Sequence, residues 1–564
     1  MRFLGPRLQA VAAIVAVAGL LTCQENTSPE TGSPQAEQVT VAYVCGRNFD
    51  IGNGNPTAVT VRFDVAGTGE NGELTLPAGP PSLTRLTTAT SGAVHLSVAG
   101  AAAGEASNGG VSCPAPDPAY PEPQATIGEW GAPFDWPVVA VHLHLLPDGR
   151  VLSWGGMGGP QTWNPATGVF TEVPLSTNIF CAGHVFLSDG RLLVAGGHII
   201  SEHGLAGTNL FDFSTNSWSP AAAMARGRWY PTTTELADGR VLVMAGRDEN
   251  GLETSVPEIW DGSSWTALTA ADRALPYYPR TFVAPNGKVF YAGEARQASY
   301  LDPVTGVWTS VARSLYGDRE YGSAVMFGTG KVLIVGGSTV RSGAPTSSAE
   351  VIDLADAAPA WRPTGSMAFA RRQFNATLLP DGRVVATGGT SAPGFTDPAG
   401  AVHAAEAWDP ATGEWTTWAS NAVTRLYHST TILLPDGRLL HSGSGDGGGI
   451  PRELSAERFS PPYLFHGPRP VVSSVPAAVG YGERFEVVSA DAGTIVRVTW
   501  VRLSSVTHAF DQNQRFVSLS FRRAAGGLTV EAPGDRNLAP PGHYMLFAIN
   551  GAGVPAVARI MQVH

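Results

Sequence analysis

The chain has 564 residues, of which 43% are hydrophobic and 15% charged, and its formal net charge is -11. This length can bury a sizeable core and allows more than one domain. The acidic balance offers no basic surface for phosphate backbones, which argues against nucleic acid as a partner.

Glycine and proline are abundant, with 67 and 43 residues. Both disfavour long helices, and beyond the N-terminus we find no extended stretch with apolar residues at helical spacing. The composition therefore predicts an all-β fold in which many short strands are joined by tight turns.

The N-terminus resembles an export signal. Within residues 1–23, two arginines precede an apolar run from Leu8 to Leu21 that is short for a membrane span. Cys23 ends a segment that resembles a bacterial lipoprotein box, and a linker follows over 24–37. We expect an exported protein, either extracellular or held at the cell surface or outer membrane by a lipid anchor at Cys23.

Residues 38–115 alternate between apolar and polar side chains, as at 59–63, which predicts a small N-terminal β-sandwich. Cys45 and Cys113 flank this segment and could pair in an oxidising compartment. A second linker is expected over 116–127.

A turn signature recurs seven times at intervals of 41 to 55 residues. Asp-Gly and Asn-Gly pairs favour tight hairpins, and several copies are followed by a glycine pair and a tryptophan. Such a repeat is typical of kelch-type blades, so we predict a seven-bladed β-propeller over 128–457. Residues 458–564 alternate without the signature and predict a C-terminal immunoglobulin-like β-sandwich. The seven turns are Asp148-Gly149-Arg150, Asp189-Gly190-Arg191, Asp238-Gly239-Arg240, Asn286-Gly287-Lys288, Thr329-Gly330-Lys331, Asp381-Gly382-Arg383 and Asp436-Gly437-Arg438.

The position eight residues before each turn is equivalent in every repeat. If the entering strand is the innermost one, these positions face the central channel at one level. A wet channel alone would explain polar residues there, and a lone cysteine is often a small buried hydrophobe. Cys181 and Tyr230, however, lie in neighbouring blades, where the sulfur could reach the phenol ring. The seven ring positions are Ala140, Cys181, Tyr230, Tyr278, Tyr321, Gln373 and His428.

Tyr427 immediately precedes the ring position His428. On a regular strand two consecutive side chains point in opposite directions. Both can reach one metal ion only if the chain bends there.

Four segments resemble the metal-site motifs of the galactose oxidase and glyoxal oxidase family, and they occur in the same order. The similarity extends from about residue 128 to the C-terminus. The segments are 178–183 around Cys181, 228–232 around Tyr230, 425–429 around Tyr427 and His428, and 507–515 beginning Thr507-His508.

The resemblance implies a Cu(2+) site with Tyr230, Tyr427, His428 and His508 as ligands. It also implies a thioether between Cys181 and Tyr230, with the radical on the linked tyrosine. Tyr427 would act as general base while an alcohol or a hydrated aldehyde is oxidised and O2 is reduced to H2O2. The C-terminal domain would supply His508.

The substrate side resembles the glyoxal oxidase branch. Galactose oxidase has a tryptophan stacked on its thioether, and counting from the turns places Asp248 there. We expect Tyr278, Tyr321, Gln373 and Asp248 to line a pocket for a small aldehyde or primary alcohol.

Three alternatives remain open. Two keep the copper and change the substrate, giving a galactose-type oxidase or an aryl or alkyl alcohol oxidase. The third is a kelch propeller that binds a polysaccharide or a protein without redox chemistry. We expect a monomer in each case.

Overall fold

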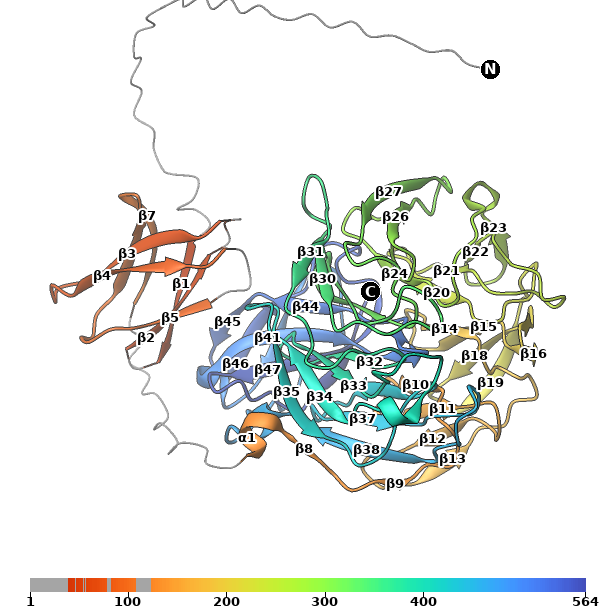
Figure 1. Ribbon diagram of the computed structural model, residues 1–564. Helices are drawn as coiled ribbons and strands as arrows, with labels where there is room; N and C mark the ends of the chain where they lie inside the picture. The colour runs from red at the N-terminus through yellow and green to blue at the C-terminus, as the bar shows by residue number, and fades with distance from the viewer. Residues whose placement is uncertain (1–38, 46, 54, 56, 79–82, 108–122) are drawn as a thin grey trace, which may run out of the picture. The chain divides into compact units, whose positions relative to one another are not determined.

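The computed structural model describes residues 39–45, 47–53, 55, 57–78, 83–107 and 123–564 (Figure 1). These residues fall into two compact units: the first contains the described residues up to 43 and from 47 to 107, and the second contains residues 123–564 together with 44 and 45. Across the described ranges no helix is long and apolar enough to cross a membrane. The predicted export signal, Cys23, the linker over 24–37 and Cys113 lie outside them. The predicted linker over 116–127 is described only from residue 123, where α1 (Gln124–Ile127) is one helical turn.

The first unit consists of two antiparallel sheets packed on one core. Alternate residues of one strand, Val59, Val61 and Val65, are buried with Phe49 and Ile51 of the facing sheet. This alternation is what the sequence pattern predicts for a sheet with one buried face. One sheet contains β1 (Val39–Cys45), β2 (Asn48–Asn53) and β5 (Leu83–Thr87), and the other contains β4 (Asn71–Leu76), β3 (Val59–Val65), β6 (Val94–Val98) and β7 (Ala101–Ala106).

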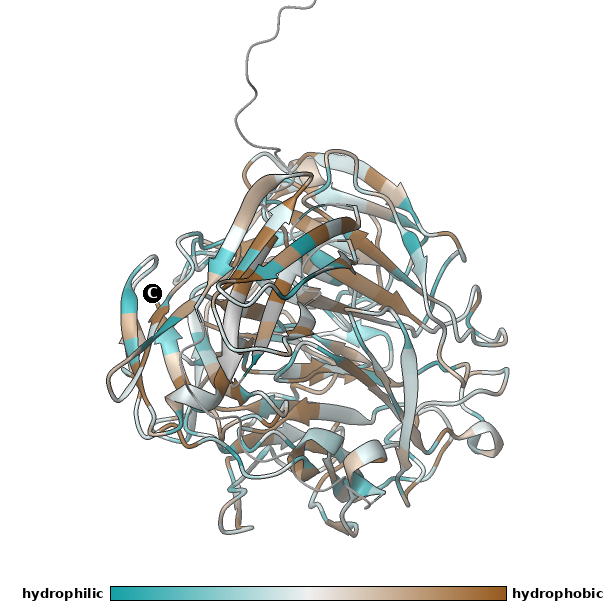
Figure 2. Cartoon of the chain, turned by 90° about the vertical axis from the view of Figure 1, so that its left-hand side faces the viewer, coloured by the Kyte–Doolittle hydropathy of each residue, from teal (hydrophilic) through white to brown (hydrophobic). Residues whose placement is uncertain are grey.

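The second unit begins with seven antiparallel sheets, counted within residues 123–564. The all-β prediction is confirmed, and apolar residues run along the strands (Figure 2). Their strands, in sheet order, are β10 (His142–Leu145), β11 (Val151–Trp154), β12 (Gln161–Trp163), β13 (Phe170–Glu172); β14 (Gly183–Phe186), β15 (Leu192–Ala195), β18 (Thr208–Asp212), β19 (Ser217–Ala221); β20 (Thr232–Glu235), β21 (Val241–Met244), β22 (Glu258–Trp260), β23 (Trp265–Ala267); β24 (Arg280–Val283), β25 (Val289–Gly293), β26 (Gln297–Leu301), β27 (Trp308–Arg313); β28 (Ser323–Gly328), β29 (Lys331–Val335), β30 (Ala349–Asp353), β31 (Arg362–Thr364); β32 (Asn375–Leu378), β33 (Val384–Thr387), β34 (Ala404–Trp408), β35 (Trp415–Ser420); and β36 (Thr430–Leu433), β37 (Leu439–Ser442), β38 (Ser455–Ser460). A hairpin of β16 (His198–Ile200) and β17 (His203–Gly204) projects from the second sheet.

The repeated turn joins the first two strands of each sheet. At Asp189-Gly190-Arg191 the aspartate accepts the backbone N–H of Arg191 at 3.0 Å and its guanidinium Nε–H at 2.7 Å. Gly190 has φ +89°, a conformation that glycine adopts without strain. The Asp-Gly-Arg form of the signature therefore encodes a turn that is closed by its own side chains.

The last sheet takes its outer strands from the beginning of this unit. β8 (Glu129–Trp130) and β9 (Phe134–Asp135) pair antiparallel with β38. The first strands of successive sheets contact one another, and β10 contacts β36. β42 (Ser505–Thr507) lies between β10 and β14 and completes this circle.

Buried ion pairs fasten the segments that lead into the first strands. Arg371 donates to Glu406 at 2.6 Å, and both side chains are fully buried. Equivalent pairs join Arg228 to Glu258, Arg319 to Glu350 and Arg425 to Glu457. Each arginine lies two or three residues before a ring position. The ion pairs therefore fix the backbone that leads into those ring positions.

The C-terminal residues form two further sheets around a core of their own. A hairpin of β42 and β43 (Phe510–Asp511) leaves these sheets, and β42 pairs with β10. Gln512 then accepts the backbone N–H groups of His184 and Thr233 through its side-chain oxygen. The strands of the two sheets are β39 (Ala478–Val479), β48 (Arg559–Val563), β47 (Gly542–Asn550), β41 (Ile495–Arg502), β44 (Phe516–Leu519), and β40 (Arg484–Val488), β46 (Gly527–Glu531), β45 (Phe521–Ala524).

Candidate copper site

The ring positions share an unusual backbone conformation. Each lies two residues before the first strand of its sheet. Six of the seven have positive φ, from +46° at Tyr278 to +69° at His428, and Ala140 does not. Positive φ is unfavourable for residues with a side chain, so its repetition marks a turn that the surrounding structure imposes.

Hydrogen bonds between backbones connect neighbouring ring positions. Tyr230 N–H donates to Cys181 O at 2.9 Å, and Tyr278 N–H donates to Tyr230 O at 3.0 Å. Cys181, Tyr230 and Tyr278 accordingly pack in one buried cluster, together with Trp229. The backbone thus places the thiol beside the phenol at one level.

Two phenols and two imidazoles converge next to this cluster. The hydroxyl oxygens of Tyr230 and Tyr427 are 2.5 Å apart, and His428 Nε2 lies 3.4 Å from the Tyr230 hydroxyl. The ring centroid of His508 is 4.4 Å from that of Tyr230 and 4.6 Å from that of His428. All four side chains are buried.

The predicted bend between Tyr427 and His428 is present. With φ +69° at His428, the two rings stack with centroids 3.8 Å apart instead of pointing in opposite directions. Both therefore reach the same space.

Hydrogen bonds orient the two imidazoles. His428 Nδ1–H donates to Gly445 O at 2.7 Å, which leaves the lone pair of Nε2 directed toward Tyr230. His508 Nδ1 is 2.7 Å from Thr507 Oγ1, while its buried Nε2 has no hydrogen-bond partner among the described residues. An orphaned buried nitrogen is costly, and a metal ion would satisfy it.

The two imidazoles are neutral, as a cation site requires, whereas the two phenols must lose their protons to bind a cation. Burial lowers the pKa of His428 to about 3 and that of His508 well below its ordinary value, so both imidazoles are neutral and can bind a metal. Burial raises the pKa of Tyr230 and of Tyr427 well above the usual range. Two imidazole nitrogens with two phenol oxygens form a donor set suited to Cu(II).

A tryptophan covers the face of Tyr230, and the sequence analysis missed it. Trp229 lies flat on the phenol ring, with centroids 3.7 Å apart and an interplanar angle of 11°. The positive φ of Tyr230 folds the preceding side chain back over it, as happens with Tyr427 over His428. An aromatic residue directly before an aromatic ring position is the signal that could have identified it.

The expectation that Asp248 lines the pocket over Tyr230 is therefore wrong. Its carboxylate accepts the backbone N–H groups of Asn250 and Leu252 at 2.8 and 2.9 Å and lies 3.4 Å from Arg226. Counting from the turn predicts the level of a residue along the sheet but not the direction in which a loop side chain points. The Asp248 side chain forms its hydrogen bonds within its own loop.

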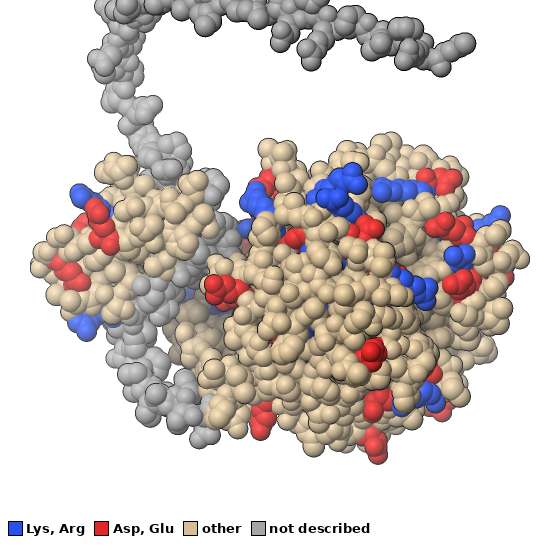
Figure 3. All heavy atoms as spheres, in the orientation of Figure 1, with Lys and Arg blue, Asp and Glu red and all other residues tan. Residues whose placement is uncertain are grey.

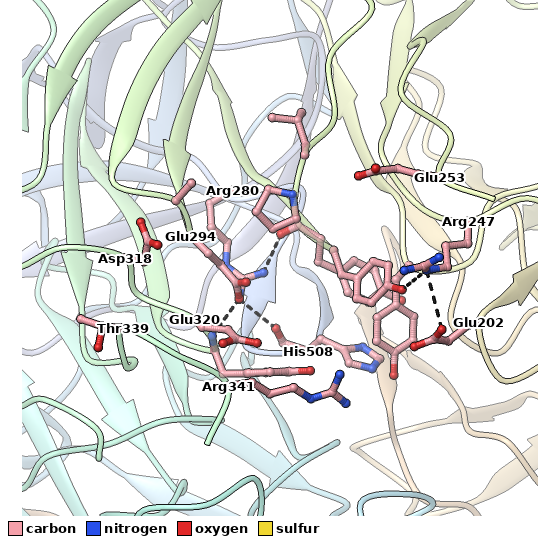
Figure 4. A pocket seen from close by; sticks show the side chains of 17 residues that line it. Glu202, Arg247, Glu253, Arg280, Glu294, Asp318, Glu320, Thr339, Arg341 and His508 are labelled. Atoms are coloured by element: carbon pink, nitrogen blue, oxygen red, sulfur yellow. Dashed lines mark hydrogen bonds and ion pairs between the residues drawn. The ribbon is translucent and has the colours of Figure 1, made fainter. Parts of the chain in front are cut away.

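A cavity of about 380 Å³ opens onto the site (Figure 4). Tyr278 and Tyr321 line it, as predicted, together with Tyr230 and His508. Gln373 is not among the residues that line it: its side chain is buried, and neither polar atom of its amide has a hydrogen-bond partner within the described chain.

The lining of the cavity carries more charged side chains than the predicted lining of two phenols, an amide and one carboxylate. Burial raises the pKa of Glu294 to about 7, and Glu294 lies 3.5 Å from Arg280. Arg247 contacts the Tyr277 hydroxyl. The charged lining residues are Glu202, Arg247, Glu253, Arg280, Glu294, Asp318, Glu320 and Arg341. Sequence counting missed them because most lie on loops after the second strands of their sheets.

Comparisons with known proteins agree with this geometry. The family profile described as "Glyoxal oxidase N-terminus" matches residues 160–463, and the "Galactose oxidase-like, Early set domain" profile matches 469–563. The chain belongs to this family of oxidases. The predicted resemblance is thereby confirmed.

Several characterised proteins resemble the chain over most of its length. It is 29% identical to a galactose oxidase of Gibberella zeae, covering 79% of this chain and 72% of that protein. It is 29% identical to the aldehyde oxidase GLOX of Vitis pseudoreticulata, covering 70% of this chain and 84% of the relative. A solved fungal alcohol oxidase in complex with copper superposes with a TM-score of 0.71 at 28% identity, covering 78% of this chain and 99% of the other.

Proposed function

We propose that this protein is a copper-radical oxidase that converts small aldehydes, as hydrates, or primary alcohols and reduces O2 to H2O2. The seven sheets are the blades of a kelch-type propeller, and the C-terminal sheets are a β-sandwich that supplies one ligand. The convergence of Tyr230, Tyr427, His428 and His508, with Nε2 of both histidines left available, carries the proposal.

The chain's own residues have separate roles. Bound copper supplies a one-electron acceptor, and a radical on the thioether-linked Tyr230 supplies the second oxidising equivalent. Tyr427, whose hydroxyl oxygen is 2.5 Å from that of Tyr230, takes the hydroxyl proton of the substrate as general base in its deprotonated form. Trp229 excludes water from one face of the Tyr230 ring.

The cavity bears on substrate choice. Its guanidinium and carboxylate groups can hydrogen-bond to hydroxyl-rich molecules, and Tyr278 and Tyr321 narrow the approach. A hydrated aldehyde presents two such hydroxyls. The same lining and the stacked Trp229 favour a galactose-type oxidase as the second candidate.

The remaining sequence predictions belong to the same proposal. The protein is exported, either extracellular or tethered through a lipid at Cys23, and acts as a monomer without nucleic acid. On the face shown in Figure 3, side chains of both charge signs are interspersed among uncharged surface.

Peroxide release over a panel of aldehydes, primary alcohols and galactose tests the function. Copper-loaded protein should bind one ion per chain and release peroxide with at least one class, with small aldehydes and short alcohols ahead of galactose. Cys181→Ser should retain copper but lose most activity, because the ligands remain and the cross-link cannot form. Wild-type protein that takes up no stoichiometric copper would instead indicate a binding propeller.

A further inference from the structure

Three histidines are fully buried beside the site and are not among its ligands. His142 and His144 lie on β10, and His184 lies on β14. Ser505, on β42, contacts two of them. Trp154 stacks on His142 and His144, with centroids 4.8 and 4.5 Å apart.

One obligatory donor sets the direction of the hydrogen bonds from Cys181 to Ser505. The backbone N–H of Cys181 donates to His142 Nε2 at 3.1 Å, so the proton of His142 is on Nδ1. His142 Nδ1–H then donates to His184 Nε2 at 2.9 Å. His184 Nδ1–H in turn donates to Ser505 Oγ at 2.7 Å. The Ser505 hydroxyl donates to His184 O at 3.2 Å, and His144 Nδ1 lies 3.0 Å from Ser505 Oγ.

All three imidazoles are neutral, as this chain of bonds requires. Burial lowers the pKa of His184 to about 3 and holds the pKa values of His142 and His144 well below their ordinary range. Each ring therefore has one donor and one acceptor nitrogen.

The chain of bonds ends on the residue whose geometry matters most for the cross-link. Cys181 has φ +62°, and its carbonyl oxygen accepts the N–H of Tyr230 at 2.9 Å. Its own N–H is held by His142. Both peptide groups of the strained cysteine are therefore fixed, one by the tyrosine it faces and one by the histidines.

The other end of this chain of bonds is Ser505, on the strand that immediately precedes the proposed copper ligand His508. Ser505 and Thr507 are both in β42, and His508 follows directly. A hairpin from the C-terminal sheets and the backbone of Cys181 are thus joined through His184 and His142.

We propose that His142, His184 and Ser505 are positioning residues for the thioether, which hold Cys181 against Tyr230 when the hairpin that carries His508 is docked. The inference rests on the proposed function. In the reaction, the S–H bond of Cys181 and one ring C–H bond of Tyr230 break, and a C–S bond forms. Two electrons and two protons pass to dioxygen, which becomes hydrogen peroxide.

The test follows cross-link formation by mass spectrometry after copper and oxygen are added to copper-free protein. The peptide pair that contains Cys181 and Tyr230 loses two hydrogens, and the fraction of alkylatable Cys181 falls. His142→Phe removes the acceptor and should slow this reaction about tenfold, the effect of losing about one hydrogen bond. His142→Gln places an amide near the Nε2 position and should restore most of the rate.

His144→Phe is the matched control. His144 is equally buried, lies on the same strand and stacks on the same tryptophan, but it is outside the path from Ser505 to Cys181. It should cross-link at the wild-type rate. Ser505→Ala, a small change, should slow cross-linking while copper content stays near one ion per chain.

The outcomes are distinguishable. Equal rates in wild type, His142→Phe and Ser505→Ala would overturn the positioning role and leave the oxidase proposal intact. Equal slowing by His144→Phe and His142→Phe would also overturn it, because general packing would then explain the effect. A wild-type protein that binds copper without losing two hydrogens would overturn the proposed function itself, and this inference with it.

Discussion

Replacing Tyr427 by phenylalanine separates metal binding from turnover. The substitution removes one hydroxyl and keeps the ring, which stacks on His428 and meets Phe395 edge-on with centroids 5.0 Å apart. Three of the four proposed copper donors remain. We therefore expect Tyr427→Phe to fold and to retain copper.

Turnover should fall sharply, because the proposed general base is lost. Positioned proton transfer contributes about 10²- to 10⁴-fold to a rate, which corresponds to roughly 3 to 5 kcal/mol of activation free energy. The Tyr230 hydroxyl also loses its partner at 2.5 Å and keeps only His428 Nε2 at 3.4 Å.

The assay measures peroxide release at saturating substrate and copper per chain on the same preparation. A Tyr321→Phe variant is the control, because it removes a hydroxyl from a ring whose centroid is 6.1 Å from that of Tyr427 and which is outside the proposed donor set. If Tyr427→Phe turns over at the wild-type rate, Tyr427 is not the base. If it loses copper together with activity, its hydroxyl acts as a ligand first.

Three further predictions address the ligand, the fold and pH. His508→Ala should abolish or greatly weaken copper binding while the circular dichroism spectrum stays unchanged, and retained copper would exclude His508 as a ligand. Arg371→Met leaves Glu406 buried without its partner and should lower the free energy of unfolding by about 3 to 5 kcal/mol. Combining Arg371→Met with Glu406→Leu should recover much of this loss. Denaturant melts of both variants measure the difference. Burial lowers the pKa of His543 to about 4, below the unfolded value of about 6.5. Between these two pH values the unfolded state binds more protons than the folded state. The free energy of unfolding should therefore fall as the pH drops through this window. His543→Phe should flatten that pH dependence in urea melts.

The constant offset from the turn signatures predicted the level along the first strands at which the site residues lie. The reason is physical. Each turn signature fixes the start of a hairpin, so a constant offset from it reaches the same point of each entering strand. Cys181, Tyr230 and His428 were found in this way, and the resemblance added His508, which no repeat contains. Turn signatures alone could not have shown that β42 pairs with β10, because that contact joins residues more than three hundred positions apart.

Directions of side chains were not predictable in the same way. The side-chain direction of Trp229 depends on the positive φ of Tyr230, and that of Gln373 depends on its own positive φ. The sign of φ cannot be read from the pattern of apolar and polar side chains. Asp248 failed for a related reason, since its loop is closed by its own hydrogen bonds. The histidines His142 and His184 lie in strands that otherwise read as ordinary apolar runs.

The pairing of β8 and β9 with β38 determines where the chain can be shortened. A deletion that ends before residue 123 removes the first unit and leaves every strand of the last sheet in place. A deletion that extends through Asp135 strips the outer strands from β38 and exposes unpaired backbone along its edge, a template for self-association. A few residues near 130 thus decide whether a shortened chain keeps the edge of β38 covered, although they lie far along the chain from every proposed copper donor.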